Sequence, residues 1–243
     1  MAGLTRSAPP IALRLEVLAS LAGALALGIL VTASWTDAAA GAGRFGLLMA
    51  LAALWIWRRL PEHAPHDRWG WANHITAARG WLLLLWLAWG WSAPVAGWGS
   101  VVLGTVFLLA DGVDGALARR QRTASPFGAR FDLEVDALFV GVASLLLWRI
   151  GSVGAWILLG ALLRYGYLAA GYRWPALRTP LPPSRRRAIC GVTHAALLTA
   201  GFAPILPAAL VQTLLFFGLL QLSASFLIDV RAQLGRSPMI RLS

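Results

Sequence analysis

The sequence predicts an all-α, polytopic membrane protein with about eight transmembrane helices, in which two N-terminal helices precede a core of six. Its 243 residues are 58% hydrophobic and only 13% charged, whereas about a quarter of the residues in a soluble domain are charged. The apolar residues form runs near the ~20 residues that cross the hydrocarbon core of a bilayer. These runs are continuous rather than alternating, which favours helices over the strands of a barrel.

Eight apolar runs define the predicted helices. In chain order they cover residues 12–34, 44–57, 76–94, 98–120, 131–150, 152–173, 187–203 and 205–229. The first run is longer than the ~7–15 apolar residues at the centre of a signal peptide, so we expect a retained helix. The second run is short and the fourth ends in polar residues. The other five have about the length of a membrane span.

Polar stretches divide the chain into three predicted parts. These are a two-helix membrane unit with a cytoplasmic linker (1–69), the six-helix core (70–230) and a cytoplasmic tail (231–243). The linker contains His63, His66 and two acids, but in no spacing recognised for a metal site. We therefore expect this linker to be solvated.

The arginines predict the topology. The chain has 21 basic residues, all arginine, and with a cytoplasmic N-terminus 18 of them, Arg79 included, are assigned to cytoplasmic loops. Arg44 and Arg149 fall on the other side, and Arg164 lies within a run. The positive-inside rule predicts this bias for eight spans with both termini in the cytoplasm. We expect an integral protein of the bacterial inner (plasma) membrane.

Charge and cysteine content bear on two further classes of protein. A net charge of +11 is also found in nucleic-acid-binding proteins, but membrane topology explains it here, so no nucleic-acid partner is expected. The single cysteine, Cys190, excludes an internal disulfide. Its apolar surroundings predict a buried, unreactive thiol.

Four aspartates in the fourth and fifth runs form the most informative pattern. Asp111 and Asp114 are three residues apart, and Asp132 and Asp136 are four apart, so each pair shares one face of a helix. The connection contains Ser-Pro and Gly, which favour a turn between adjacent antiparallel helices. We expect the two pairs to face each other, with Asp111 ~12 Å from the cytoplasmic loop at 1.5 Å per residue.

Carboxylates at that depth need compensation. Four ionised aspartates are costly there unless they are paired, hydrated or bound to metal. An oxygen-only ligand set suits one or two Mg²⁺ or Mn²⁺ ions. Gly115 and Ala118 leave room beside the metal, and Arg119 offers a planar fork for phosphate. Together these features predict phosphoryl-group chemistry in a cavity open to the cytoplasm.

Two other interpretations account for part of the pattern. In the first, the aspartates pair with arginines and hold helices together, but this does not explain why small residues lie among them at fixed spacing. A divalent-cation or solute transporter explains the carboxylates, but it does not explain Gly115, Ala118 and Arg119. The transporter stays an alternative of a different class.

The stretch from Asp111 to Asp136 resembles the signature D-x2-D-G-x2-A-R-x8-G-x3-D-x3-D of the CDP-alcohol phosphotransferase (CDP-alcohol phosphatidyltransferase) family. Its fixed positions match without a gap at Asp111, Asp114, Gly115, Ala118, Arg119, Gly128, Asp132 and Asp136. Upstream, Asn73, Ile75, Thr76 and Arg79 resemble the family's N-x-I-T-x-x-R entry to the first core helix, with Ala72 where proline is common. The six later runs match the family's core, and the two N-terminal runs fall outside it.

The resemblance implies a membrane enzyme of phospholipid synthesis. Such an enzyme transfers a phosphatidyl group from a CDP-linked donor, often CDP-diacylglycerol, to a small alcohol and releases CMP. It implies that Asp111, Asp114, Asp132 and Asp136 coordinate two Mg²⁺ or Mn²⁺ ions, and that Asp136 is also the general base. The implied donor-site residues are Gly115, Ala118, Arg119, Ser125 and Gly128, with Asn73 and Thr76 closing the site. The resemblance also implies a possible homodimer, because family members commonly dimerise.

The acceptor alcohol is expected to contact the later helices. Arg164 has a depth similar to that of the aspartates, and Arg185, Arg186 and Arg187 follow a predicted helix start, where anions bind well. Competing interpretations are pairing of Arg164 with an aspartate and ordinary positive-inside charge for the other three. Glycerol 3-phosphate is the acceptor that we expect first, and inositol phosphate is the next. Serine, inositol and choline stay open, because Gly191-Val192 replaces a glycine-lysine run common in the family.

Overall fold

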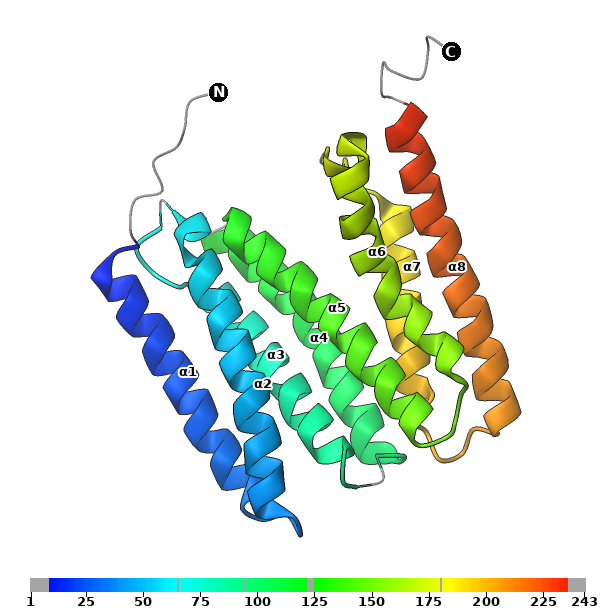
Figure 1. Cartoon of the computed structure of the whole chain (residues 1–243), viewed down its shortest axis with the longest axis horizontal. Helices are drawn as coiled ribbons and strands as arrows, with labels where there is room; N and C mark the ends of the chain where they lie inside the picture. Colours follow the sequence, from blue (N-terminus) through cyan, green and yellow to red (C-terminus); the bar gives the residue numbers. More distant parts are fainter. Residues whose placement is uncertain (1–8, 65, 94, 122–124, 180, 236–243) are drawn as a thin grey trace. The chain divides into compact units, whose positions relative to one another are not determined.

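The computed structural model describes residues 9–64, 66–93, 95–121, 125–179 and 181–235, and of residues 112–121 it describes the helix but not the side chains. Within these ranges the chain is all-α, with eight α-helices and no strand (Figure 1). The helices are α1 (Ile11–Thr32), α2 (Ala38–Arg59), α3 (Trp71–Gly90), α4 (Trp98–Gln121), α5 (Pro126–Arg149), α6 (Leu159–Arg173), α7 (Arg185–Ala200) and α8 (Ala208–Gly235). Three short 3-10 turns are η1 (Leu60–His63), η2 (Ala155–Leu158) and η3 (Pro175–Arg178).

The predicted class, an all-α polytopic membrane protein, is confirmed, and each predicted run corresponds to one helix. Several helix ends differ from the predicted bounds, and the largest difference is the start of α6, which lies at Leu159, seven residues after the predicted start. Helix α2 begins at Ala38 rather than at residue 44, because Ala38-Ala39-Ala40 are the best helix formers. Helix α3 begins at Trp71, five residues before the predicted start.

Among the residues that the structure describes, three helices are long and apolar enough to cross a membrane: α1, α2 continued through η1 to His63, and α8. Helices α6 and α7 have 15 and 16 residues, which rise roughly 22–24 Å, less than the ~30 Å of the hydrocarbon core. Eight complete spans therefore stay a prediction.

The chain divides into two compact units, which cut across α4 and α5. One unit is Met1–Pro94 with Leu109–Leu138, and the other is Val95–Leu108 with Phe139–Ser243. The first unit contains α3 and the halves of α4 and α5 that carry the signature. The division into residues 1–69, 70–230 and 231–243 does not follow these units and stays a prediction of chain organisation.

In the first unit, α1, α2 and α3 pack against one another. Phe45 and Met49 of α2 form a buried cluster with α3 residues Leu84, Leu85 and Ala88. Gly28 of α1 is required for this packing, because a Cβ there would lie 2.0 Å from the Phe45 ring.

Near the start of α2, Asp37 accepts hydrogen bonds from Arg44 and Ser92. These bonds, the one from Ser92 first, hold the pKa of Asp37 below its ordinary value, so that Asp37 stays charged. The loop before α2 is thereby fixed to the end of α3.

The starts of α3 and α5 position the site. Gly70 precedes α3 with φ 79°, a left-handed conformation that favours glycine. Ser125 immediately precedes helix α5, and its Oγ accepts a hydrogen bond from the Gly128 N–H at 3.0 Å, while Pro126 occupies the first helical position. This is a serine N-cap followed by proline, a favourable start for a helix.

In the second unit, α8 packs against both α6 and α7. Helix α5 ends in this unit at Arg149, and Gly151, two residues later, has φ 74°. The N–H groups of Gly151 and Ser152 donate to the Trp148 and Leu147 carbonyls at 3.0 and 3.1 Å. This pattern is a Schellman cap, and it ends the helix sharply before α6.

Candidate metal centre

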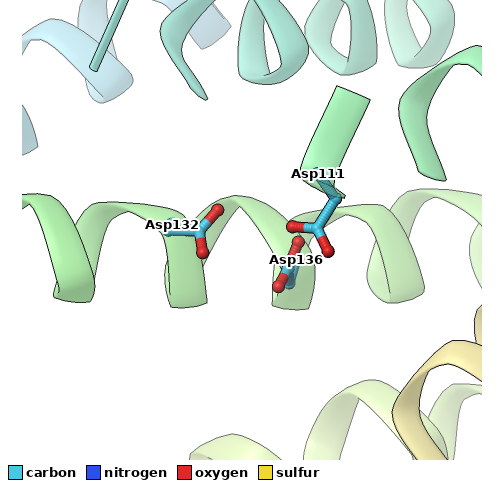
Figure 2. Close-up of side chains that lie close together, drawn as sticks. All are labelled: Asp111, Asp132 and Asp136. Carbon is cyan, nitrogen blue, oxygen red and sulfur yellow. The ribbon is translucent and has the colours of Figure 1, made fainter. Parts of the chain in front are cut away.

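Three of the four predicted aspartates come together. One carboxylate oxygen from each of Asp111, Asp132 and Asp136 lies within 4.8 Å of the other two. Figure 2 shows the carboxylate of Asp111, from α4, beside Asp136, with Asp132 one turn along α5. Asp132 and Asp136 share a face because they are four residues apart on one helix. The predicted meeting of the two helices' aspartates is confirmed for these three.

A buried arginine from α3 bridges the cluster. The Arg79 side chain is only 2% exposed. Its Nη1 donates to Asp132 Oδ1 at 2.9 Å, and its Nη2 donates to Asp136 Oδ1 at 2.7 Å. The same Nη2 lies 3.0 Å from Asp111 Oδ1. One guanidinium thus orients all three carboxylates, which suits its rigid fork of donors.

The assignment of Arg79 to a cytoplasmic loop was wrong. It is the ninth residue of α3 and lies inside the helix, and residue 79 also falls within the predicted apolar run 76–94. The sequence contained a signal for its role: an arginine within an apolar run normally pairs with an acid and marks a functional site.

The charges of the cluster suit a divalent cation. When all are ionised, the three clustered carboxylates and the Arg79 guanidinium carry two net negative charges, counted over the side chains that the structure describes, and one divalent ion would balance them. The Asp111, Asp132 and Asp136 side chains are 38%, 38% and 44% exposed, so a ligand can reach them. The donors are oxygens, as Mg²⁺ and Mn²⁺ prefer. Arg79 does pair with the acids, as the ion-pairing interpretation expects, but its one charge does not neutralise three carboxylates.

Four further predicted residues lie on the same turns of α4. The side chains of Asp114, Gly115, Ala118 and Arg119 fall outside the described part of the structure. Their predicted contacts with metal or donor therefore stay predictions.

The remaining predicted donor-site residues gather where α3 meets the start of α5. Asn73 and Ser125 are buried, and a Cβ built on Gly128 would lie 3.0 Å from Asn73 Oδ1 and 3.3 Å from Ser125 Oγ. Asn73 Nδ2 also donates to the Trp69 carbonyl at 2.6 Å. Thr76, one turn along α3, is buried and donates from Oγ1 to the Ala72 carbonyl at 3.1 Å. Asn73, Ser125 and Gly128 thus pack as one group.

The expectation of a solvated linker before α3 was wrong for part of that segment. Leu60, His63 and Trp69 are buried. The Nδ1 atom of His63 lies 2.8 Å from Ser125 Oγ, and its Nε2 atom lies 2.8 Å from the Arg68 carbonyl oxygen. A histidine outside the predicted core therefore contacts a predicted donor-site residue.

The predicted acceptor-site arginines belong to the second unit. Arg186 donates to Ser225 Oγ and to Asp229 Oδ1, each at 2.5 Å. Arg187 donates to the same Asp229 oxygen at 3.2 Å. Arg185, at the start of α7, is exposed, whereas Arg164 of α6 is partly buried. Sequence reasoning missed Asp229, whose charge offsets only one of the two arginines that it contacts.

Comparison with known families gives one match. The model of the family described as CDP-alcohol phosphatidyltransferase matches residues 69–228. The matched region contains Arg79 and the three clustered aspartates, and it excludes α1, α2 and His63. Comparison with curated proteins and with solved structures gives no match.

Proposed function

Because the chain belongs to the CDP-alcohol phosphatidyltransferase family, we propose that it transfers a phosphatidyl group from CDP-diacylglycerol to a small alcohol and releases CMP. The observation that carries the proposal is the cluster of Asp111, Asp132 and Asp136 around Arg79, within 4.8 Å and inside the matched region. Family membership supports transfer from a CDP-linked alcohol, and CDP-diacylglycerol as the donor is the finer part of the proposal.

The metal ions are proposed to be Mg²⁺ or Mn²⁺, two per site. Asp111, Asp132 and Asp136 would hold them, with Asp114 as a further ligand. When bound, such ions would offset the negative charge that develops on the departing CMP. Support comes from the oxygen-only donor set and from the two net negative charges that Arg79 leaves on the three acids.

Asp136 is proposed as the general base. It would accept the proton of the acceptor hydroxyl, whose oxygen then bonds to the phosphorus of the phosphatidyl group as the bond from that phosphorus to the CMP oxygen breaks. In support, Asp136 is the most exposed of the three acids, at 44%. The hydrogen bond from Arg79 to Asp136 Oδ1 fixes the orientation of the carboxylate, and positioning of this kind supplies a large part of a rate enhancement.

The donor nucleotide is proposed to lie along the start of α5 and the facing turns of α3 and α4. Asn73 and Thr76 would close the site from α3, while Ser125 and Gly128 line it from α5. Gly115, Ala118 and Arg119 of α4 would complete it. The packing of Asn73 against Gly128 supports the α3 and α5 part of this proposal.

The acceptor is proposed to carry a phosphate, with glycerol 3-phosphate first and inositol phosphate next. Arg164, Arg185, Arg186 and Arg187 are the proposed contacts. The pairing with Asp229 leaves one net positive charge on Arg186 and Arg187, which favours an anionic group beside them. We further propose that the protein lies in the bacterial inner membrane and that its active site opens to the cytoplasm. The excess of arginines predicted in cytoplasmic loops supports this orientation.

An acceptor screen tests the proposed function. Purified protein with CDP-diacylglycerol and Mg²⁺ or Mn²⁺ is incubated with glycerol 3-phosphate, inositol phosphate, serine, inositol or choline, and CMP is measured. We expect the most CMP with glycerol 3-phosphate. A preference for serine, inositol or choline would reject the phosphorylated acceptor alone. Metal flux in proteoliposomes without CMP from any acceptor would reject the transferase and favour the transporter.

A further inference from the structure

The first two helices lie outside the region that the family model matches, and the proposed function gives them no task. We infer that this N-terminal segment completes the donor site, because His63 of η1 and Glu16 of α1 fix the residues that begin α5 and α3. The inference rests on the proposed function, which places Ser125, Gly128 and Asn73 in the donor site. His63 is a positioning residue, acting through Ser125.

The hydrogen bonds of His63 determine which ring nitrogen carries the proton. The side chain is fully buried, at 0% exposed. Nε2 lies 2.8 Å from the Arg68 carbonyl, and a carbonyl oxygen only accepts, so Nε2 carries the hydrogen. In the neutral ring Nδ1 is then an acceptor. Ser125 Oγ, 2.8 Å away, therefore donates its hydrogen to Nδ1.

This bond fixes the hydroxyl of Ser125. Its hydrogen is directed to His63, while its oxygen accepts the Gly128 N–H at 3.0 Å as the N-cap of α5. The capped turn places Gly128 against Asn73 Oδ1, where even a Cβ would be only 3.0 Å away. A change at His63 is thus transmitted through Ser125 to the surface shared by Gly128 and Asn73.

Glu16 provides a second link, from α1 to the start of α3. Its Oε2 accepts the Trp69 N–H at 3.0 Å, and its Oε1 lies 3.2 Å from Nε2 of His74. The Trp69 carbonyl in turn accepts the Asn73 amide at 2.6 Å. The N-terminal segment therefore fixes Asn73 from one side and Ser125 from the other.

Packing between the same elements supports the assignment. The ring centroids of Trp55, on α2, and Phe131, on α5, lie 5.9 Å apart in a stacked arrangement. Glu62 of η1 lies 3.3 Å from Arg130 of α5. The contact between His63 and Ser125 is thus part of a continuous interface between the N-terminal segment and α5.

Substitutions at His63 separate positioning from simple packing. His63→Asn retains an acceptor near the Nδ1 position, His63→Gln retains only a donor near Nε2, and His63→Phe retains the ring without either nitrogen. Loss of the bond to Ser125 should raise the KM for CDP-diacylglycerol about threefold to tenfold in His63→Phe and His63→Gln. His63→Asn should restore a KM near the wild-type value. The KM for the acceptor and the half-saturating Mg²⁺ should stay within about twofold in all three variants.

The experiment measures CMP release with each substrate varied in turn, on full-length protein. Ser125→Ala should raise the donor KM at least as much as His63→Phe does, because it removes the N-cap of α5 as well as the bond to His63. The double variant should match Ser125→Ala, because the bond to His63 is already lost in that variant. Asp67→Asn, an exposed position in the same segment, is the control and should leave the donor KM unchanged. If His63→Phe is not recovered folded, the comparison of His63→Gln with His63→Asn carries the test.

Three outcomes would overturn the inference: an unchanged donor KM in His63→Phe or His63→Gln, a His63→Asn enzyme as impaired as His63→Gln, or effects of His63→Phe and Ser125→Ala that add independently. Wild-type protein that releases no CMP with any acceptor would reject the proposed function, and this inference with it. Wild-type turnover together with any of the three outcomes would reject the inference alone.

Discussion

Replacing Arg79 with methionine should make the stability of the protein depend on divalent metal. The change removes the Arg79 guanidinium from among three carboxylates whose oxygens lie within 4.8 Å of one another. Two unit charges 4.8 Å apart repel by roughly 3.5 kcal/mol at an effective dielectric constant of about 20, and by roughly 0.9 kcal/mol in water. Because the carboxylates are 38–44% exposed, solvent screening favours the lower part of this range. We expect Arg79→Met to lose about 1–3 kcal/mol of unfolding free energy without metal.

The assay is thermal unfolding of purified Arg79→Met and wild-type protein, in EDTA and in saturating Mg²⁺. Saturating Mg²⁺ should reduce the difference in unfolding temperature between Arg79→Met and the wild type, since a bound cation replaces the missing positive charge. Arg79→Lys should fall between them, because an ammonium group is a point charge and does not reproduce the guanidinium fork. The reasoning is refuted if Arg79→Met unfolds at the wild-type temperature in EDTA, or if Mg²⁺ leaves the difference unchanged.

Three further predictions test other parts of the account. Arg164→Ala should raise the KM for a phosphorylated acceptor roughly ten- to a hundredfold, as loss of a charge-assisted phosphate contact does; an unchanged acceptor KM would remove Arg164 from the pocket. An impermeant thiol reagent on intact cells should label a cysteine at Ala96 and spare one at Thr179, both exposed in the structure, and labelling at Thr179 would overturn the topology. Gly128→Ala should raise the donor KM several-fold, because the new Cβ would lie 3.0 Å from Asn73 Oδ1; a wild-type donor KM would contradict the proposed packing at the donor site.

The meeting of three aspartates was predictable from the sequence because local geometry determines it. Asp132 and Asp136 share a face at a spacing of four, and the short connection after α4 returns the chain beside Asp111. The position of Arg79 was not predictable in the same way. Its depth depends on where α3 begins, and that start lies at Trp71, five residues earlier than the apolar run indicates.

Contacts between distant parts of the chain account for the other differences. His63 lies in a stretch of proline and polar residues that resembles a solvated linker. Its burial depends on Trp69 and Phe127, whose ring centroids lie 5.9 and 5.8 Å from its own. Asp229 pairs with Arg186 from more than forty residues away in sequence. Periodicity along one helix carries no information about such pairings.

The decisive experiment compares the Mn²⁺ dependence of CMP release in the wild type and in Asp132→Asn, and it tests one claim. The claim is that Asp111, Asp132 and Asp136 hold the divalent ion required for transfer from a CDP-linked donor. Wild-type release should be absent in EDTA and saturate with Mn²⁺, whereas Asp132→Asn should lose release or need at least about tenfold more Mn²⁺, as expected when a carboxylate ligand becomes an amide. Glu134→Gln, an acid on the same helix outside the cluster, is the matched control. Full release in EDTA, or the wild-type Mn²⁺ dependence in Asp132→Asn, would contradict the claim.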